Sequence, residues 1–400
     1  MRRLLLRGSV PAFGAISYAA YSNRPVYHES LNLRRKPDDY DGSSKHVTLG
    51  VAAVSTTASL AERPDGKLTE DEVEFLRTGL YSPPTKDESV LLKAARAAAI
   101  ASVTAISMFF IEVLNDFRVI GNERNHRYLM DLVEQGKDRD RGMITVSNHT
   151  SVFDDPVLQS CLTSFIHPDK MRWGVCKDTI CFSNAFSASF TGAGKVLPVR
   201  VGAGIEQPAF KAAGRRLAEG EWVHIYPEAA CIQSGTIGKG QIWGCRKEDK
   251  AKDIGLLKWG VGKLAARTAF QAGDVPPLII PYYHLGMDKV KPQRNTPESN
   301  GLLDPWYIPG RVGNEIRVFV GPPIDVADLI QEYEKKHGKR RIARVREDNS
   351  FVDWEGSTEA ERELHSRITK RVEEALLKLE EEALEYQRLK QLQKDQQRLN

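Results

Sequence analysis

The chain has 400 residues, 41% apolar and 28% charged, which is typical of a folded protein with one large domain and extensions or two small domains. Its net charge of +4 is too small to indicate nucleic-acid binding, although a mild basic excess suits an anionic lipid surface. The five cysteines include no CxxC pair, so we expect reduced thiols rather than a disulfide scaffold or a zinc site.

Residues 1–88 are predicted to form an N-terminal extension. The first 36 residues contain seven basic side chains and one acidic side chain, Glu29. A start that is rich in arginine and poor in acids is typical of mitochondrial targeting, and a solvated basic tail is the alternative.

An apolar run at 97–111 follows Lys93 and Arg96 and ends before Glu112. Its length of about 15 residues is below the roughly 20 that a helix needs to cross a bilayer. We therefore expect a helix that dips into one leaflet or lies at its surface, with a buried core helix as the alternative.

From about residue 118, helix-like and strand-like segments alternate. Helices are expected at 123–135, 156–164 (with Asp155 as N-cap), 208–218 and 256–270, and strands at 143–147, 196–199, 222–226, 278–282 and 316–320. This alternation predicts an α/β domain over 89–330, built on a mixed, largely parallel sheet flanked by helices. The polar, glycine-rich segment 234–253 is expected to be a surface loop.

Residues 331–400 are predicted to form a basic linker and a long amphipathic helix. Thr358 and Glu361 have the spacing of a capping box, and apolar residues then recur every three or four positions as far as Tyr386. A helix of this length needs a partner, which is its own domain, another protein or a second copy. The basic residues at 335–346 suit either anionic headgroups or solvent.

The segment 148–154 reads NHTSVFD and lies between a predicted strand and a predicted helix. On a continuous helix His149 and Asp154 would lie about 140° apart. Across a strand-to-helix turn, Asp154 can fold back and hold one ring nitrogen of His149, leaving the other nitrogen free as a base for acyl transfer. The alternatives are a helix cap for Asp154 and simple packing for His149.

Three further polar residues are candidates for substrate binding. Arg200 follows the strand at 196–199, and its guanidinium can grip a phosphate or form a surface ion pair. Glu228 ends the segment YPE after another strand and can hold a glycerol hydroxyl, orient Arg200 or remain a solvated loop acid. Asn148 completes the set. Because α/β folds build their sites at strand ends, we expect these residues to share one site.

Four segments follow one another along the chain: NHx4D, a strand that ends in arginine, YPE, and an apolar strand with Pro281. Their order resembles that of the blocks of the glycerolipid acyltransferase superfamily, over about 95–327. Segments at 171–173, 178–182, 222–228, 257–264 and 284–287 are similar to the tafazzins within it. The resemblance implies a phospholipid–lysophospholipid transacylase that remodels cardiolipin at the mitochondrial inner membrane, as a peripheral or monotopic protein without metal or cofactor.

The same resemblance implies a role for each site residue. His149 would deprotonate the hydroxyl of a lysophospholipid, and Asp154 would stabilise the imidazolium that forms. Arg200 and Glu228 would position phosphate and glycerol.

The third block departs from the family pattern. The superfamily usually has glycine after the glutamate, and the tafazzins then have lysine, whereas this chain has Ala229 and Ala230. If the glycine has a positive φ, alanine costs stability or moves the loop, and the missing lysine removes a phosphate donor.

Two alternatives to the transacylase follow. The first is a structural, cardiolipin-binding subunit of a mitochondrial inner-membrane complex, with a degenerate site and a protein partner bound through 357–400. The second is a lysophosphatidate acyltransferase that depends on acyl-CoA, and a strict need for added acyl-CoA would identify it.

Overall fold

The computed structural model describes residues 90–159, 162, 170–182, 190–200, 205, 207–232, 237, 257–271, 275–291, 310–339 and 357–399. The predicted extension at 1–88 lies outside these residues. So do nearly all of the predicted loop at 234–253 and the basic positions after Lys339.

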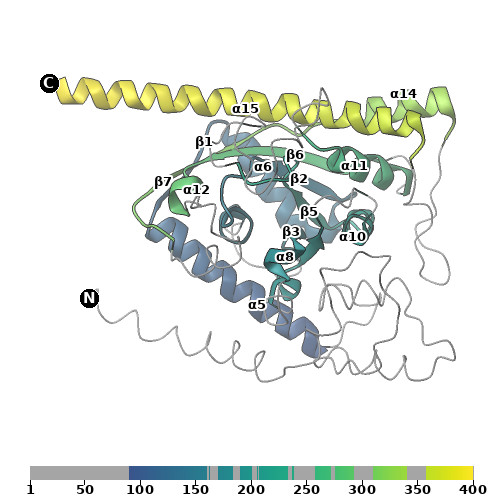
Figure 1. Cartoon of the computed structure of the whole chain (residues 1–400), viewed down its shortest axis with the longest axis horizontal. Coiled ribbons are helices and arrows are strands. Elements are labelled where there is room, and N and C mark those ends of the chain that lie inside the picture. The colour runs from purple at the N-terminus through teal and green to yellow at the C-terminus, as the bar shows by residue number, and fades with distance from the viewer. Residues whose placement is uncertain are drawn as a thin grey trace.

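A five-stranded sheet in the order β1-β7-β6-β2-β5 forms the centre of the molecule (Figure 1). Its strands are β1 (Asp116–Ile120), β2 (Met143–Ser147), β5 (Trp222–Ile225), β6 (Leu278–Leu285) and β7 (Glu315–Val320). β2 is parallel to both of its neighbours, β1 is parallel to β7, and β6 is antiparallel to β7. The prediction of a mixed, largely parallel sheet is therefore confirmed.

Two further parallel strands, β3 (Gly174–Lys177) and β4 (Val196–Val199), extend this arrangement beyond β5. A parallel bridge between Trp173 and Val223 joins β3 to β5. The Trp173 N–H donates to the Trp222 carbonyl at 2.7 Å, and the His224 N–H donates to the Trp173 carbonyl at 2.7 Å. β4 consequently lies three strand spacings from β2.

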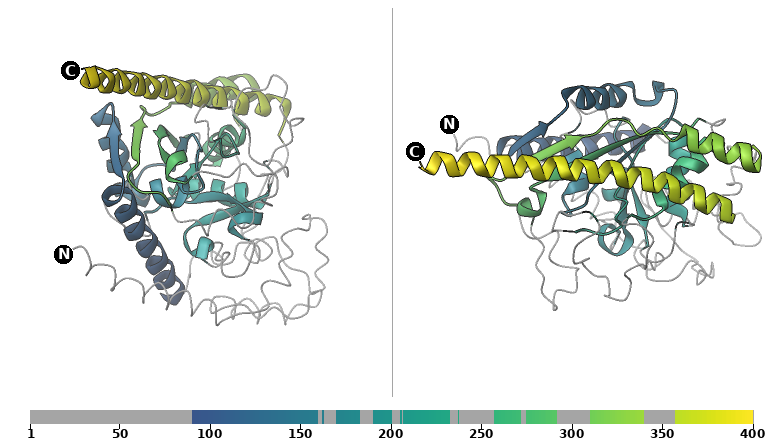
Figure 2. Two further views of the ribbon diagram at one scale, coloured as in Figure 1. Left: turned by 60° about the vertical axis from the view of Figure 1, so that its left-hand side comes forward. Right: turned by 90° about the horizontal axis from the view of Figure 1, so that it is seen from above.

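Helices cover both faces of the sheet, which gives three layers (Figure 2). One face carries α10 (Pro208–Ala218), α11 (Gly260–Gln271), α14 (Ala327–His337) and α15 (Glu359–Leu399). The other carries α5 (Val90–Met108), the π-helical turn η3 (Phe109–Val113), α6 (Glu123–Gln135) and the short α12 (Met287–Val290). All five residues of β2 are buried, as expected for a central strand between two helical layers.

The start of the helix predicted at 156–164 differs from the structure, and residues 160–161 and 163–164 lie outside the described residues. A π-helical turn, η5 (Asp154–Leu158), begins two residues earlier, and Phe153 occupies its N-cap position. Asp155 does not cap this turn, because its carboxylate pairs with Arg172. α11 also begins at Gly260 rather than at 256.

α5 and η3 follow one another directly, so the helical segment is longer than the predicted apolar run. Within the described part of the chain, Arg96–Val113 is long and apolar enough to cross a membrane, judged by length and composition alone. A share of 33% of this segment is buried in the protein, and Phe109 and Val113 are exposed.

Apolar residues of α15 belong to the same core cluster as the sheet and α11. The capping box is confirmed: the Thr358 N–H donates to Glu361 at 2.9 Å and the Glu361 N–H donates to Thr358 at 3.2 Å. Gly262 of α11 faces the His365 carbonyl of α15 so closely that a Cβ there would clash. Of the predicted partners, its own domain covers the first part of the helix through a row of buried side chains, Leu364, Ile368, Val372, Leu376, Leu379 and Ala383.

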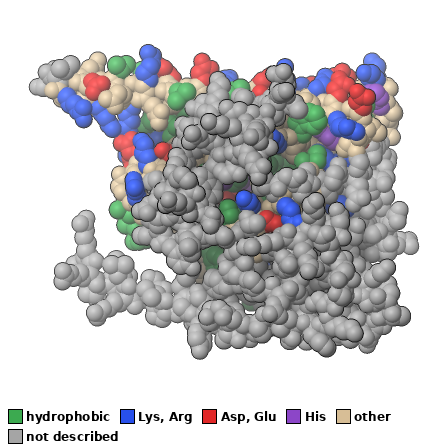
Figure 3. All heavy atoms as spheres, in the orientation of Figure 1, with side chains coloured by type: hydrophobic (Ala, Val, Ile, Leu, Met, Phe, Trp, Pro, Cys, Tyr) green, Lys and Arg blue, Asp and Glu red, His purple; other side chains and the backbone are tan. Residues whose placement is uncertain are grey.

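The distal part of α15 projects beyond the sheet (Figures 1 and 2). Charged side chains of both signs line the helix on the face shown in Figure 3. Leu384, Leu389 and Leu392 are about half exposed there, at 51%, 49% and 50%.

Candidate active site

The candidate site lies at the edge of the sheet where the parallel strands β2, β5 and β6 end. The NHTSVFD loop follows β2, the YPE segment follows β5, and His284 lies at the end of β6. Because the three strands run in the same direction, their carboxyl ends bring these segments to one edge.

Asp154 folds back onto His149 across the turn after β2. Its Oδ2 lies 3.0 Å from His149 Nδ1 and also accepts the backbone N–H groups of Thr150 at 2.7 Å and Ser151 at 2.8 Å. Because Oδ2 accepts these two N–H groups, it is also the acceptor toward Nδ1, so Nδ1 carries the ring proton and Nε2 presents a lone pair. The Asp154 side chain is fully buried, while that of His149 is 21% exposed, so the base is reachable and its partner is shielded.

The YPE segment supports His149 from a second direction. Glu228 Oε1 accepts the backbone N–H of His149 at 3.0 Å. The Tyr226 ring stacks on the imidazole with 4.1 Å between centroids and 21° between planes. Burial raises the pKa of Tyr226 well above 10, so this ring stays neutral. Together these contacts fix both the backbone and the ring plane of His149.

Ala229 adopts the left-handed backbone conformation expected of the family's glycine, with φ of 54°. Its N–H donates to the Tyr226 carbonyl at 3.0 Å, which closes the turn around Glu228. The following chain returns to the site, because the Ile232 N–H donates to the His149 carbonyl at 2.6 Å. The turn therefore forms without glycine.

Asn148, predicted to bind substrate, is almost completely buried. Its Nδ2 donates to the His284 carbonyl at 2.9 Å, and its Oδ1 accepts the His284 N–H at 3.0 Å. Both ends of the amide are thus engaged by the backbone of β6. The side chain ties β2 to β6 beneath the site.

Arg200 lies apart from the His149–Asp154 pair. Its Nε is 3.1 Å from Asp178 Oδ2, and its backbone N–H donates to Gln207 at 2.8 Å. Arg200 follows β4, which lies three strand spacings, roughly 14 Å, from β2. Glu228, by contrast, contacts His149 directly.

A layer of buried polar side chains underlies the site. His224 Nδ1 lies 2.8 Å from Thr145 Oγ1, which also accepts the Trp222 indole N–H at 2.8 Å. The Tyr282 hydroxyl lies 3.4 Å from His224 Nε2. Burial, reinforced by nearby Arg172, lowers the pKa of His224 well below its usual 6.5, so this histidine is neutral.

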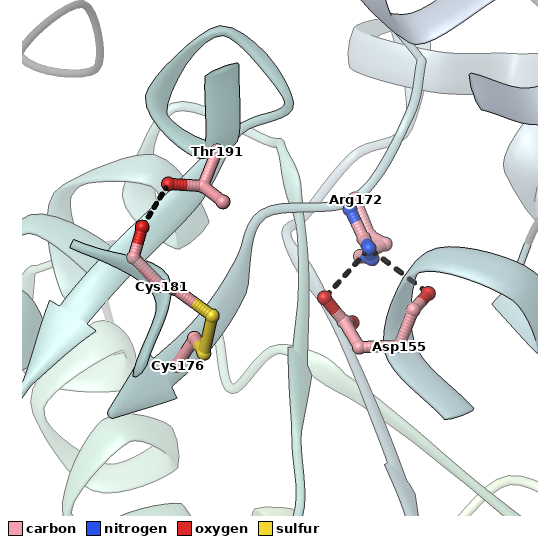
Figure 4. The surroundings of a disulfide bond; sticks show 5 residues. All are labelled: Asp155, Arg172, Cys176, Cys181 and Thr191. Atoms are coloured by element: carbon pink, nitrogen blue, oxygen red, sulfur yellow. Dashed lines mark hydrogen bonds and ion pairs between the residues drawn. A yellow bond between two sulfur atoms is a disulfide. The ribbon is translucent and has the colours of Figure 1, made fainter. Parts of the chain in front are cut away.

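Asp155 and Arg172 form a buried ion pair beside Asp154, with 2.8 Å between Oδ2 and Nη2 (Figure 4). Gly174 makes room for it, since a Cβ there would lie 2.9 Å from the same carboxylate oxygen. Burial raises the pKa of Asp155, and Arg172 opposes this shift. Sequence reasoning assigned Asp155 only a capping role. The MRW segment at 171–173 was the available signal for its partner.

The expectation of reduced thiols is wrong for two of the five cysteines: Cys176 and Cys181 form a disulfide (Figure 4). The short helix α8 (Asp178–Cys181) reverses the chain after β3 and brings the two Cα atoms to 6.1 Å, although the pair lacks CxxC spacing. The bond spans Asp178, the partner of Arg200. Thr191 donates to the Cys181 carbonyl at 3.0 Å and braces the same turn.

Among the described residues, no group of three or more histidine, cysteine, aspartate or glutamate side chains could hold a metal ion. The chemistry that these residues offer is that of an oriented histidine base next to a shielded carboxylate.

The sequence of the chain is similar to known acyltransferases. The acyltransferase family model matches residues 117–284, from β1 to His284. Tafazzin of Drosophila melanogaster is 30% identical over 249 residues, covering 61% of this chain and 55% of that protein. Taffazin of Dictyostelium discoideum is 32% identical over 207 residues, covering 51% and 62%.

A third relative is the N-acylphosphatidylethanolamine synthase of Arabidopsis thaliana, 29% identical over 232 residues and matched over 70% of its length. The chain spans somewhat more than half the length of the two tafazzin relatives. The matched domain contains the His149–Asp154 pair, Glu228 and Arg200. The chain therefore contains a domain of the acyltransferase family that is similar to the tafazzins.

Proposed function

We propose that the chain is a transacylase that moves an acyl group from a phospholipid to a lysophospholipid, with cardiolipin remodelling as its role. The observation that carries the proposal is the contact between Asp154 Oδ2 and His149 Nδ1, which leaves the exposed side of the ring as a base. No acyl-CoA, metal or other cofactor takes part in the proposed reaction.

In this reaction His149 Nε2 takes the proton of the lysophospholipid hydroxyl, and the resulting oxygen attacks an acyl ester of the donor phospholipid. A new ester bond forms while the donor's acyl–oxygen bond breaks. The departing oxygen takes the proton back from the imidazolium and leaves as a second lysophospholipid. Asp154 stabilises the imidazolium between the two transfers.

Arg200 is the proposed phosphate contact, because its guanidinium can grip a phosphate through paired donors. Glu228 is proposed to contact the glycerol while its other oxygen holds the His149 backbone. Lys258 is proposed to take the role of the lysine that the tafazzins have at the position of Ala230. Its backbone N–H donates to the Pro227 carbonyl at 2.8 Å, and its side chain is exposed. Asn148 keeps a positioning role in this proposal.

The proposed location is the mitochondrial inner membrane, with α5 and η3 as the membrane-contacting segment. The arginine-rich start of the chain and the exposed apolar residues Phe109 and Val113 support it. Fractionation of tagged protein with carbonate extraction tests this. Recovery in a soluble, non-mitochondrial fraction would contradict it.

One acyltransfer assay tests the proposal. Purified protein in cardiolipin-containing bilayers receives acyl-labelled phosphatidylcholine and monolysocardiolipin without acyl-CoA. Label should appear in cardiolipin, and His149→Ala should abolish the transfer while the unfolding midpoint stays close to wild type. Retained turnover would exclude His149 as the base.

The same assay distinguishes the competing functions. Transfer of label from acyl-labelled acyl-CoA, with none from phosphatidylcholine, would indicate an acyl-CoA-dependent acyltransferase. Phosphatidylethanolamine is included as a second acceptor, because one relative is an N-acylphosphatidylethanolamine synthase. Label on its amine would make nitrogen the acceptor.

A structural, cardiolipin-binding subunit is the second candidate, favoured by the half-exposed leucines on the distal part of α15. Deleting all of 357–400 is not a clean test, since it removes buried residues such as Leu364 and Val372. Truncation after Arg388 keeps those residues. It should shift the protein out of a larger complex on a native gel, and unchanged migration would count against this function.

A further inference from the structure

His284 lies near the same carboxylate oxygen of Asp154 that His149 contacts, and it takes no direct part in the proposed acyl transfer. Its side chain is fully buried. Its backbone N–H and carbonyl are both bonded to the Asn148 side chain, so the residue is fixed to the end of β2. A fully buried histidine at this position needs a physical explanation, because an apolar side chain would fill the space at lower cost.

Hydrogen bonding determines which nitrogen of His284 carries the proton. Nε2 lies 3.0 Å from the backbone carbonyl oxygen of Asn148 and 3.5 Å from Asp154 Oδ2. Both of these oxygens only accept, so Nε2 must carry the proton. Nδ1 is buried without a hydrogen-bond partner among the described residues. A second proton there would have no acceptor, which keeps the ring neutral.

Two imidazole nitrogens therefore lie near Asp154 Oδ2, His149 Nδ1 at 3.0 Å and His284 Nε2 at 3.5 Å. Asp154 Oδ2 receives short bonds from His149, Thr150 and Ser151, all in the same loop. His284 is the described donor near this oxygen that comes from a different strand. It provides an N–H without adding a positive charge. Burial lowers the pKa of His284, which also favours the neutral ring.

We propose that His284 is a positioning residue: its Nε2–H is bonded to the Asn148 backbone carbonyl and lies beside Asp154 Oδ2, and it so keeps Asp154 in place to orient His149 for proton transfer. His284 contacts no substrate in this arrangement. The inference rests on the proposed function for its kinetic consequence, but its structural consequence can be measured without turnover.

Three substitutions in the full-length protein separate the effect of the N–H group from that of the ring volume. His284→Phe keeps the ring and removes the donor. His284→Gln places an amide N–H close to the position of Nε2, whereas His284→Asn reaches only the position of Nδ1 and is the matched control. Losing the hydrogen bond to the Asn148 backbone carbonyl predicts a fall in kcat of about threefold to tenfold for His284→Phe, with KM unchanged. His284→Gln should recover most of kcat, and His284→Asn should not.

A second readout is the tautomer of His149, followed by nitrogen NMR of histidine-labelled protein in bilayers or micelles. Wild type and His284→Gln should show the Nδ1–H form, and His284→Phe should show a mixture of tautomers. If wild type transfers no acyl group but the tautomer still responds, the proposed function fails and the positioning role stands. Wild-type kcat and tautomer in His284→Phe, or equal losses in His284→Gln and His284→Phe, would overturn the inference.

Discussion

Ala229 offers the sharpest test of the local structure, because its left-handed backbone is imposed on a residue with a side chain. This conformation costs an L-residue about 1–2 kcal/mol. Glycine removes that cost but adds about 0.4–1 kcal/mol of conformational entropy to the unfolded chain. The Ala229 side chain is exposed, so its removal loses little packing. We therefore expect Ala229→Gly to raise the free energy of unfolding by about 1 kcal/mol.

Ala230 is the matched control, since it adjoins Ala229 and has no positive φ. Ala230→Gly gains no relief of strain and should lower the free energy of unfolding by about 0.5–1 kcal/mol. Urea unfolding of both variants in the same detergent, followed by far-UV circular dichroism, measures the difference. The two midpoints should move in opposite directions.

Acyl transfer by Ala229→Gly should stay close to wild type. The turn already has the geometry that glycine would give it, with the Ala229 N–H on the Tyr226 carbonyl and Glu228 on the His149 backbone. Equal destabilisation by both glycine variants would refute the left-handed assignment. A severalfold gain in turnover would show that alanine displaces the loop.

Two other predictions concern stability. Burial lowers the pKa of His224, so near pH 6.5 the unfolded chain takes up a proton that the folded protein does not. The contribution of His224 to stability is therefore full above pH 6.5. Below pH 6.5 the free energy of unfolding falls by up to about 1.4 kcal/mol per pH unit. His224→Gln should show a shallower loss between pH 6.5 and 5, and an identical slope would contradict a neutral His224. Reducing Cys176–Cys181, which closes a loop of five residues, should lower the free energy of unfolding by about 2 kcal/mol. Cys231→Ser should respond to the reductant as wild type does, and an unchanged midpoint in both would argue against the bond.

Local signals predicted much of the fold. The bounds of α6 follow from the cap at Asn122, whose side chain accepts the Arg124 N–H, and from Gly136 at the other end. Pro208 marks the first turn of α10. β2 was recognisable as a short apolar strand, and the NHTSVFD spacing located the His149–Asp154 contact because both residues belong to one loop.

Long-range partners were not predictable in the same way. Asp155 looks like a helix cap in sequence, and only the fold brings Arg172 to it. The amphipathic pattern of α15 shows that one face is covered without identifying α11 and the sheet as the cover. The pairing of Cys176 with Cys181 depends on the reversal at α8, which no spacing rule described. The donor role of His284 likewise depends on the pairing of β6 with β2.

The position of α15 in the chain has a consequence for biosynthesis. The sheet is complete at Val320, but the apolar face under α15 stays uncovered until residues near Ala383 emerge, roughly 60 residues later. At about 5–20 residues per second, ribosomes need several seconds to make that stretch. During this interval the nascent chain exposes Phe319, Gly262 and the apolar surface around them, which α15 contacts in the folded protein. Chaperones recognise such a surface, and it promotes aggregation when it is left unprotected.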